Sequence, residues 1–208
     1  VGGSLTLHGA DVSIAAATSA TTINIHASGT VTQSNGVASS LLGLNGTGAF
    51  TLTNASNAIG TIAAGSSGAK VGAVSVYDAS GGLTIGQVGS LEGISSTGDV
   101  LIETGSGDIT LARSIATDST SNDAIIVNAG KSTAAGTATG GEVVVSGSPT
   151  LSTGSGAIVK MFSCSESAST GLTTLVGGSS NVYYGVDETS TLSPTPSSGT
   201  KYALYRST

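Results

Sequence analysis

The sequence predicts an all-β protein built as a parallel β-helix, in which short strands stack coil upon coil. Three observations predict this fold. Short alternating strands recur along the chain, equivalent apolar positions return at a step of about 18 to 19 residues, and small turn-forming residues dominate the composition. The 208 residues include 32 Gly, 35 Ser and 29 Thr, but only 6 Lys and Arg, 12 Asp and Glu, and no Trp. This composition disfavours a helical enzyme.

Composition also separates the chain from other classes. Disordered linkers combine low hydrophobicity with high net charge, whereas 38% of these residues are hydrophobic and the mean hydropathy is +0.30. The formal charge of −6 argues against a nucleic-acid partner, because phosphate binding needs clustered Lys and Arg. The sequence contains no run of about 18 apolar residues, so no membrane-spanning helix is predicted. The single cysteine, Cys164, excludes an intramolecular disulfide and is expected to be a small buried or edge residue.

The predicted strands follow one another from the first residues onward. Each alternates apolar and polar side chains over a few residues and is bounded by Gly, Asn, Ser or Asp. The segments are Ser4–Leu7, Thr22–Ile25, Ala49–Leu52, Val74–Val76, Gly82–Ile85, Asp99–Ile102, Asp108–Leu111, Ala124–Val127 and Glu142–Val145.

A nearly constant step relates these strands. Three sets of apolar residues show a step of 18 or 19 residues between neighbours. The sets are Leu7, Ile25, Leu44 and Ile62; Leu83 and Leu101; and Ile109, Val127 and Val145. A fixed coil length indicates parallel stacking, because hairpins would reverse the chain. About 18 residues per coil predict ten or eleven coils and a rod of roughly 50 Å. An antiparallel β-sandwich is the alternative, and the shortage of aromatic core residues and two-residue hairpin turns disfavours it.

The repeat divides the chain into two regions. Residues 1–162 are predicted to form the β-helix, with polar loops at 117–123 and 131–140 that protrude from the coil corners. Residues 163–208 are predicted to form a terminal coil, cap or connector, because the repeat fades there and four of the five tyrosines lie between Tyr183 and Tyr205.

Parts of this sequence resemble the repeat regions of filamentous-haemagglutinin-like exoproteins. The likeness lies in Leu44–Ile62, Gly82–Val88, Gly93–Val100 and the tail segments Ser169–Leu175, Asp187–Thr189 and Tyr202–Tyr205, and it covers nearly the whole chain. These proteins are bacterial surface and secreted adhesins of the two-partner secretion type. The resemblance implies a right-handed parallel β-helix, export to the surface of a Gram-negative bacterium, and a role in adhesion or cell-to-cell contact. The chain would then be an internal or near-terminal piece of the adhesin shaft.

Two histidines form a candidate metal pair. His8 and His26 are one predicted coil apart and each follows the second apolar residue of a strand, so we expect them to stack on adjacent coils with Asn45 and then Ala63 next in the column. Two imidazoles at this spacing could chelate a metal. No cysteine or carboxylate shares the register, so a surface ladder of His and Asn is the favoured interpretation.

Two aspartates form a candidate acid–base pair. Asp99 and Asp108 lie in matching Gly-Asp turns about half a coil apart, with Glu103 between them. Paired carboxylates cleave glycosidic bonds. Half a coil of separation, however, places the two turns on different sides of the rod, so turn capping is favoured.

Two further motifs lack the neighbouring residues that their chemistry requires. Ala129–Ser132 superficially matches the end of a phosphate-binding loop, but Ile125 stands where the first glycine belongs and no helix is predicted after Ser132. Ser67–Lys70 fits Ser-x-x-Lys without the companion motifs of acyl enzymes. We therefore assign no catalytic, cofactor-binding or metal-binding residue, and expect no cofactor.

The sequence is thus interpreted as a structural and adhesive segment of a large secreted or cell-surface bacterial exoprotein, without enzymatic activity. The expected partners are a glycan or a surface protein of a neighbouring cell and the flanking repeats of the same parent chain. A carbohydrate-binding or carbohydrate-cleaving β-helix protein, similar to a depolymerase, is the alternative. The loops at 117–123 and 131–140 and the tyrosine-bearing tail are the expected contact surfaces.

Overall fold

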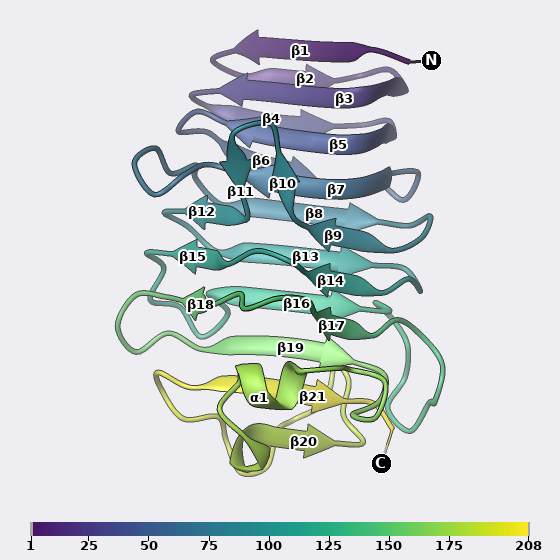
Figure 1. Ribbon diagram of the computed structural model, residues 1–208, viewed down its shortest axis with the longest axis vertical. Coiled ribbons are helices and arrows are strands. Elements are labelled where there is room, and N and C mark those ends of the chain that lie inside the picture. Colours follow the sequence, from purple (N-terminus) through teal and green to yellow (C-terminus); the bar gives the residue numbers. More distant parts are fainter. Residues whose placement is uncertain (1, 208) are drawn as a thin grey trace.

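Two long parallel β-sheets run the length of the molecule, and successive strands of the first coils alternate between them (Figure 1). The computed structural model describes residues 2–207. Sheet A contains ten strands and sheet B nine, and every pairing within them is parallel. The predicted all-β parallel architecture is therefore confirmed, and the antiparallel sandwich is excluded.

The strands of sheet A are β1 (Ser4–Gly9), β3 (Thr18–Ala27), β5 (Val37–Asn45), β7 (Ala58–Ala64), β9 (Leu83–Ile85), β12 (Ile94–Ser96), β14 (Ile109–Leu111), β15 (Ile115–Thr117), β17 (Val143–Val145) and β18 (Leu151–Ser152). Those of sheet B are β2 (Val12–Ile14), β4 (Thr30–Gln33), β6 (Ala49–Leu52), β8 (Val74–Asp78), β13 (Val100–Thr104), β16 (Ile125–Ala129), β19 (Val159–Ser163), β20 (Val182–Tyr184) and β21 (Lys201–Tyr205). The remaining elements are the hairpin strands β10 (Gln87–Val88) and β11 (Leu91–Glu92), helix α1 (Leu172–Leu175) and a 3₁₀ turn at Ser179–Asn181. No helix within residues 2–207 has the length and apolarity needed to span a membrane.

Alternating side chains build the core between the sheets. Along each strand every second residue points inward, and parallel stacking places these inward residues directly above one another. One such column, in sheet B, runs through Val12, Val31, Phe50, Val74, Val100, Ile125 and Val159. All of these except the first are buried, and they belong to one apolar cluster shared by both sheets.

The uniform step predicted from the sequence holds only in the first coils. Leu7 pairs with Ile25 and Ile25 with Leu44, as expected, but Leu44 then pairs with Ala64 rather than with Ile62. The strands of sheet B are further apart in sequence after β6, since Val74 pairs with Val100. The predicted constant coil length is therefore wrong beyond Ala64.

The later apolar spacings relate positions that do not stack. Ile109 pairs with Leu83 and Val143, whereas the predicted partner Val127 lies in sheet B beside Ile102. Insertions at the corners lengthen these coils, and only the strand segments must keep their register. The nine strands of sheet B extend over about 38 Å at 4.8 Å per strand, so the predicted ten or eleven coils and 50 Å rod are too many and too long.

Buried polar side chains join the coils at the corner where sheet B leads into sheet A. Asn57 Oδ1 accepts a hydrogen bond from Val37 N, and Asp78 Oδ1 accepts one from Ile59 N, at 2.9 and 2.8 Å. Ser163 Oγ accepts the N–H of Val143 at 2.8 Å in the same way. In each case a side chain satisfies a backbone donor at the start of a sheet A strand about one coil earlier. These contacts avoid unpaired buried N–H groups.

A small hairpin covers the outer face of sheet A. Strands β10 and β11 pair antiparallel and lie against β5 and β7 (Figure 1). The hairpin reaches the sheet at Gly43, where an added Cβ atom would meet Val88 Cγ1 at 3.3 Å and Leu91 Cδ1 at 3.5 Å. The absence of a side chain at Gly43 therefore allows this close approach.

Residues after Ser163 continue the stack and cover its last strands. Strand β21 pairs in register with β19, and β20 pairs with β21. Helix α1 contacts β17 at the same end (Figure 1). A second apolar cluster forms on the outer face of sheet B, where Ile158, Phe162, Tyr202 and Leu204 pack with residues of the tail. At the other end, β1 and β2 are the terminal strands of their sheets.

Candidate functional site

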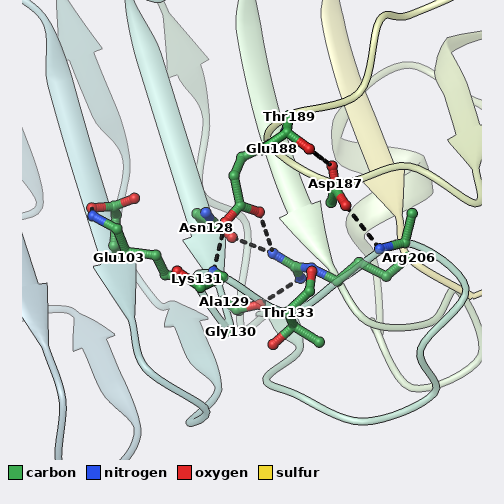
Figure 2. A network of polar contacts seen from close by, with 12 residues as sticks. Glu103, Asn128, Ala129, Gly130, Lys131, Thr133, Asp187, Glu188, Thr189 and Arg206 are labelled. Carbon is green, nitrogen blue, oxygen red and sulfur yellow. Dashed lines mark hydrogen bonds and ion pairs between the residues drawn. The ribbon is translucent and has the colours of Figure 1, made fainter.

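The loop at 131–140 and the tail meet on the outer face of sheet B, and this junction is the candidate binding surface. Strands β16 and β21 run parallel and end at the same edge of the sheet, so the loop after Ala129 starts close to Arg206. Arg206 is fully buried. Its guanidinium donates to Ala129 O at 2.7 Å, to Thr133 O at 2.9 Å and to the Asn128 side-chain oxygen (Figure 2).

Backbone groups of the loop are also held by the tail. Asp187 Oδ2 accepts the N–H of Ala135 at 2.9 Å, and Glu188 Oε1 accepts the N–H of Ser132. The N–H of Gly136 donates to Arg206 O at 2.7 Å. The Ala135 N–H and the Thr189 hydroxyl hold the pKa of Asp187 well below its usual value. The predicted protruding loop is therefore fixed in place by residues far later in the chain.

An ion pair lies beside this junction. Lys131 Nζ is 2.6 Å from Glu103 Oε2, and the carboxylate side chain is almost fully buried. The ammonium also lies 5.4 Å from the centre of the Tyr77 ring, within range of a cation–π interaction. Glu103, the carboxylate between the two candidate aspartates, therefore anchors the start of the loop.

The tyrosines of the tail mostly pack rather than form an exposed aromatic surface. Tyr202 and Tyr205 are buried, and their rings contact Tyr183 and Tyr184 at centroid distances of 5.5 and 5.7 Å. Only Tyr184 is well exposed, at 47%. Its hydroxyl donates to Glu166, and this hydrogen bond raises the pKa of Tyr184 and lowers that of Glu166.

The loop at 117–123 is also tied to its neighbours. Asp118 forms an ion pair with Lys70, and Asp123 forms one with Lys160. The hydroxyls of Ser119 and Ser121 both donate to Asp99 Oδ1. Polar side chains at this corner thus hold the loop against the adjacent coils.

The two candidate aspartates are not brought together as an acid–base pair. Asp99 precedes β13 of sheet B and caps the 117–123 loop, whereas Asp108 precedes β14 of sheet A. Asp108 Oδ1 accepts the N–H of Glu142 at 2.8 Å, which is a turn-capping contact. The interpretation of both residues as turn caps is consistent with this geometry.

The histidines stack as the sequence predicts. The rings of His8 and His26 are nearly parallel, with centroids 4.7 Å apart and an interplanar angle of 6°, and Asn45 follows in the column. Ala63 does not continue it, because Ala63 pairs with Gly43. Within residues 2–207 no three His, Cys, Asp or Glu side chains gather as a metal-binding group.

The remaining motifs have local roles. In the segment Ala129–Ser132, the N–H of Gly130 donates to Thr104 Oγ1, that of Lys131 to Thr104 O and that of Ser132 to Glu188. These donors are therefore not free to cradle a phosphate. The segment 67–70 lies at a tight turn closed by a bridge between Ser66 and Ala69. Cys164 is buried, and this burial raises the pKa of its thiol.

Sequence reasoning missed Arg206, the central residue of the junction. Tyr202–Tyr205 is a short apolar run that lies in strand β21, but nothing in the local pattern shows that the following arginine is buried. A weak signal existed, because Asp187 and Glu188 supply two acidic residues to a tail that is otherwise poor in charge. Comparison with protein-family models, with curated proteins and with solved structures finds no significant match for this chain.

Proposed function

We propose that this chain is a rigid segment of a large secreted or cell-surface bacterial exoprotein that presents binding surface for adhesion. It would belong to an adhesin of the filamentous-haemagglutinin-like type, exported by two-partner secretion to the surface of a Gram-negative bacterium. Its partners would be a glycan or a surface protein of a neighbouring cell, together with flanking repeats of the parent chain. In this proposal the chain carries no enzymatic activity.

The observation that carries this proposal is the combination of a continuous parallel stack with an irregular surface fixed upon it. Nine strands of sheet B stack along one axis over a shared apolar core, which makes a stiff support. The loop at 131–140 is held by Arg206, Asp187 and Glu188. A surface ordered before it meets its partner loses little conformational entropy on binding.

We further propose that the coils wind in a right-handed sense. In Figure 1 the nearer strands β1, β3, β5 and β7 point left while the fainter β2, β4, β6 and β8 point right, and the chain descends. This course of the chain supports a right-handed coil. Parallel strands joined by crossover connections are nearly always right-handed, which supports the same hand.

The test is attachment of beads coated with the purified chain to bacterial and host cells. We expect attachment by the unmodified chain and a loss of most of it when residues 134–138 are replaced by a Gly-Ser segment of equal length. An equivalent replacement at residues 66–69, a turn on an earlier coil, is the matched control and should leave attachment unchanged. If the unmodified chain does not attach to any cell, or both replacements act alike, the loop surface is not adhesive.

The alternative, carbohydrate cleavage, has a separate test. Asp99 and Asp108 precede strands of different sheets, so cleavage by this pair is not favoured by the geometry. Incubation with a panel of polysaccharides is expected to release no reducing ends above a blank. Turnover that disappears in both Asp99→Asn and Asp108→Asn would overturn the adhesive interpretation.

A further inference from the structure

Lys201 occupies a position at which all the strands of sheet B from β2 to β19 have an apolar residue. It is the first residue of β21 and pairs with Val159 of β19. The same inward column contains Ile125, Val100 and Val74, all of them buried. Lys201 is therefore a basic residue at the end of the apolar column of sheet B, and it is only partly exposed.

A cavity of about 480 Å³ opens beside Lys201 at this end of the molecule. The turn between β17 and β18 and helix α1 form its walls together with Lys201, and its apolar lining residues are Val145, Pro149, Leu151 and Leu175. No Asp or Glu of the described residues lines it. The cavity thus combines aliphatic side chains and the hydroxyl residues Ser148, Thr150 and Thr174 with a single positive charge.

The other lysines and arginines are all neutralised. Lys70, Lys131 and Lys160 form ion pairs with carboxylates at 2.5 to 2.6 Å. Arg113 and Arg206 lie 3.7 and 3.5 Å from Glu92 and Glu188, and among residues 2–207 Lys201 is the one Lys or Arg side chain without an ion pair. In a chain of net charge −6, this unpaired cation beside an apolar cavity is the exception.

We propose that this cavity binds the carboxyl-terminal residue of a partner polypeptide, with the carboxylate on Lys201 and an aliphatic side chain against the cavity walls. A carboxylate supplies the missing counter-ion through a charge-assisted hydrogen bond to the ammonium, and the hydroxyl residues Ser148, Thr150 and Thr174 of the lining can donate further hydrogen bonds to it. An aliphatic body matches walls of Val, Pro and Leu, whereas sugar rings are usually bound on aromatic platforms that this cavity lacks within the described part of the chain. One cation selects a ligand with one carboxylate. This site is distinct from the loop surface proposed above for adhesion.

The experiment is a titration of the isotopically labelled, purified chain with N-acetyl-Gly-Gly-Leu, followed by amide chemical shifts. We expect the resonances of Val145, Leu151, Leu175 and Lys201 to move with the free acid, and no such movement with the C-terminal amide. Binding should weaken as the salt concentration rises, because the contact is ionic. The proposal would be overturned if the peptide with the C-terminal amide caused chemical-shift changes as large as those caused by the free acid.

Three variants sharpen the test. Lys201→Gln should weaken binding of the acid at least tenfold, while Lys70→Gln, which removes a remote cation, should leave it unchanged. Ser148→Trp leaves Lys201 in place and puts a bulky ring at an exposed position of the cavity lining, so it should also abolish binding. This variant replaces Lys201→Gln if the latter fails to fold. Unchanged binding in the folded variant, or a uronate oligosaccharide that binds more tightly than the peptide, would show that the site is not a peptide-terminus site.

Discussion

Single buried polar side chains hold the corners of this fold together. Asn57 is fully buried and its amide contacts Val37 N, Leu52 O and Tyr77 O, so it links backbone groups of three successive coils. Each bond satisfies a group that would otherwise be buried without a partner, at a cost of about 1–3 kcal/mol. Asp78 has the same place one coil later but carries an ionisable group.

Asp78 makes stability depend on pH. Burial raises its pKa above the ordinary value of 3.8, although N–H groups of Ile59, Gly81 and Ser80 oppose this. Its Oδ2 atom lacks a hydrogen-bond partner within the described residues. From about pH 4 upward the unfolded chain therefore loses its proton before the native chain does. The contribution of Asp78 to stability falls as pH rises to the native pKa and is constant above it.

We predict that Asp78→Asn removes this pH dependence. The amide keeps an oxygen for Ile59 N and cannot ionise, so the free energy of unfolding of the wild type should fall relative to the variant as pH rises from 4 to 7. Urea denaturation at a series of pH values measures the difference. Asn57→Ala, a corner variant without a titrating group, should lower stability by the same amount at each pH. The prediction would be contradicted if the free energy of unfolding of the wild type rose relative to that of Asp78→Asn with increasing pH.

At the scale of elements, the irregular segments are packed parts of the structure rather than free insertions. The hairpin of β10 and β11 lies on the outer face of sheet A over Gly43. The loop at 131–140 rests on Arg206 and the tail. In both cases a close approach of two segments depends on one residue type at one position.

We predict that Gly43→Leu displaces the hairpin. An added Cβ would already lie 2.6 Å from Asn24 Oδ1 and 3.3 Å from Val88 Cγ1, so a larger side chain must push β10 and β11 away. We expect a loss of about 1–3 kcal/mol of stability and faster amide exchange across residues 87–92. Gly68→Leu is the control, because a Cβ there meets nothing within 4 Å, and it should change stability by less than about 0.5 kcal/mol. Normal protection of the hairpin in Gly43→Leu would refute this account.

At the scale of the whole molecule, the two ends of the stack differ. Among residues 2–207, strands β1 and β2 each have a neighbour on one side only, and Leu5 and Leu7 in β1 and Val12 in β2 are only partly buried. At the other end, α1, β20 and the tail cover the last strands of both sheets. Since each coil is stabilised mainly by its neighbours, an uncovered end is the least stable part of a solenoid.

We predict a gradient of hydrogen exchange along the axis. Amides of β1 and β2 should exchange fastest, those of β8, β13 and β16 slowest, and those of β19 and β21 should stay protected by the covering tail. Exchange measured by mass spectrometry on proteolytic fragments reports each strand separately. Equal protection of β1 and β13 would show that the stack opens only as a single unit.

Much of the fold could be predicted from local pattern. The alternation of apolar and polar residues identified inward residues such as Ile25, Val76 and Ile102. Apolar side chains at every second position of a strand lie on one face of the sheet, and that face packs against the core. The step from Leu7 to Ile25 to Leu44 identified parallel stacking, and it also predicted the stacked rings of His8 and His26. These features depend on neighbours in sequence or on a repeat that no insertion interrupts.

The tertiary structure alone decided which strands lie together after Ala64 and how the candidate surface is built. Ile109 and Val127 are separated by the predicted coil step yet belong to different sheets, because the lengths of corner insertions leave no trace in the alternation of the strands. Arg206 is buried because β16 and β21 end at one edge, which brings together residues that are distant in sequence. The sequence by itself determined the inward face of each strand through local hydrophobic pattern. Register across variable loops and pairing of distant charges are set only when the whole stack has closed.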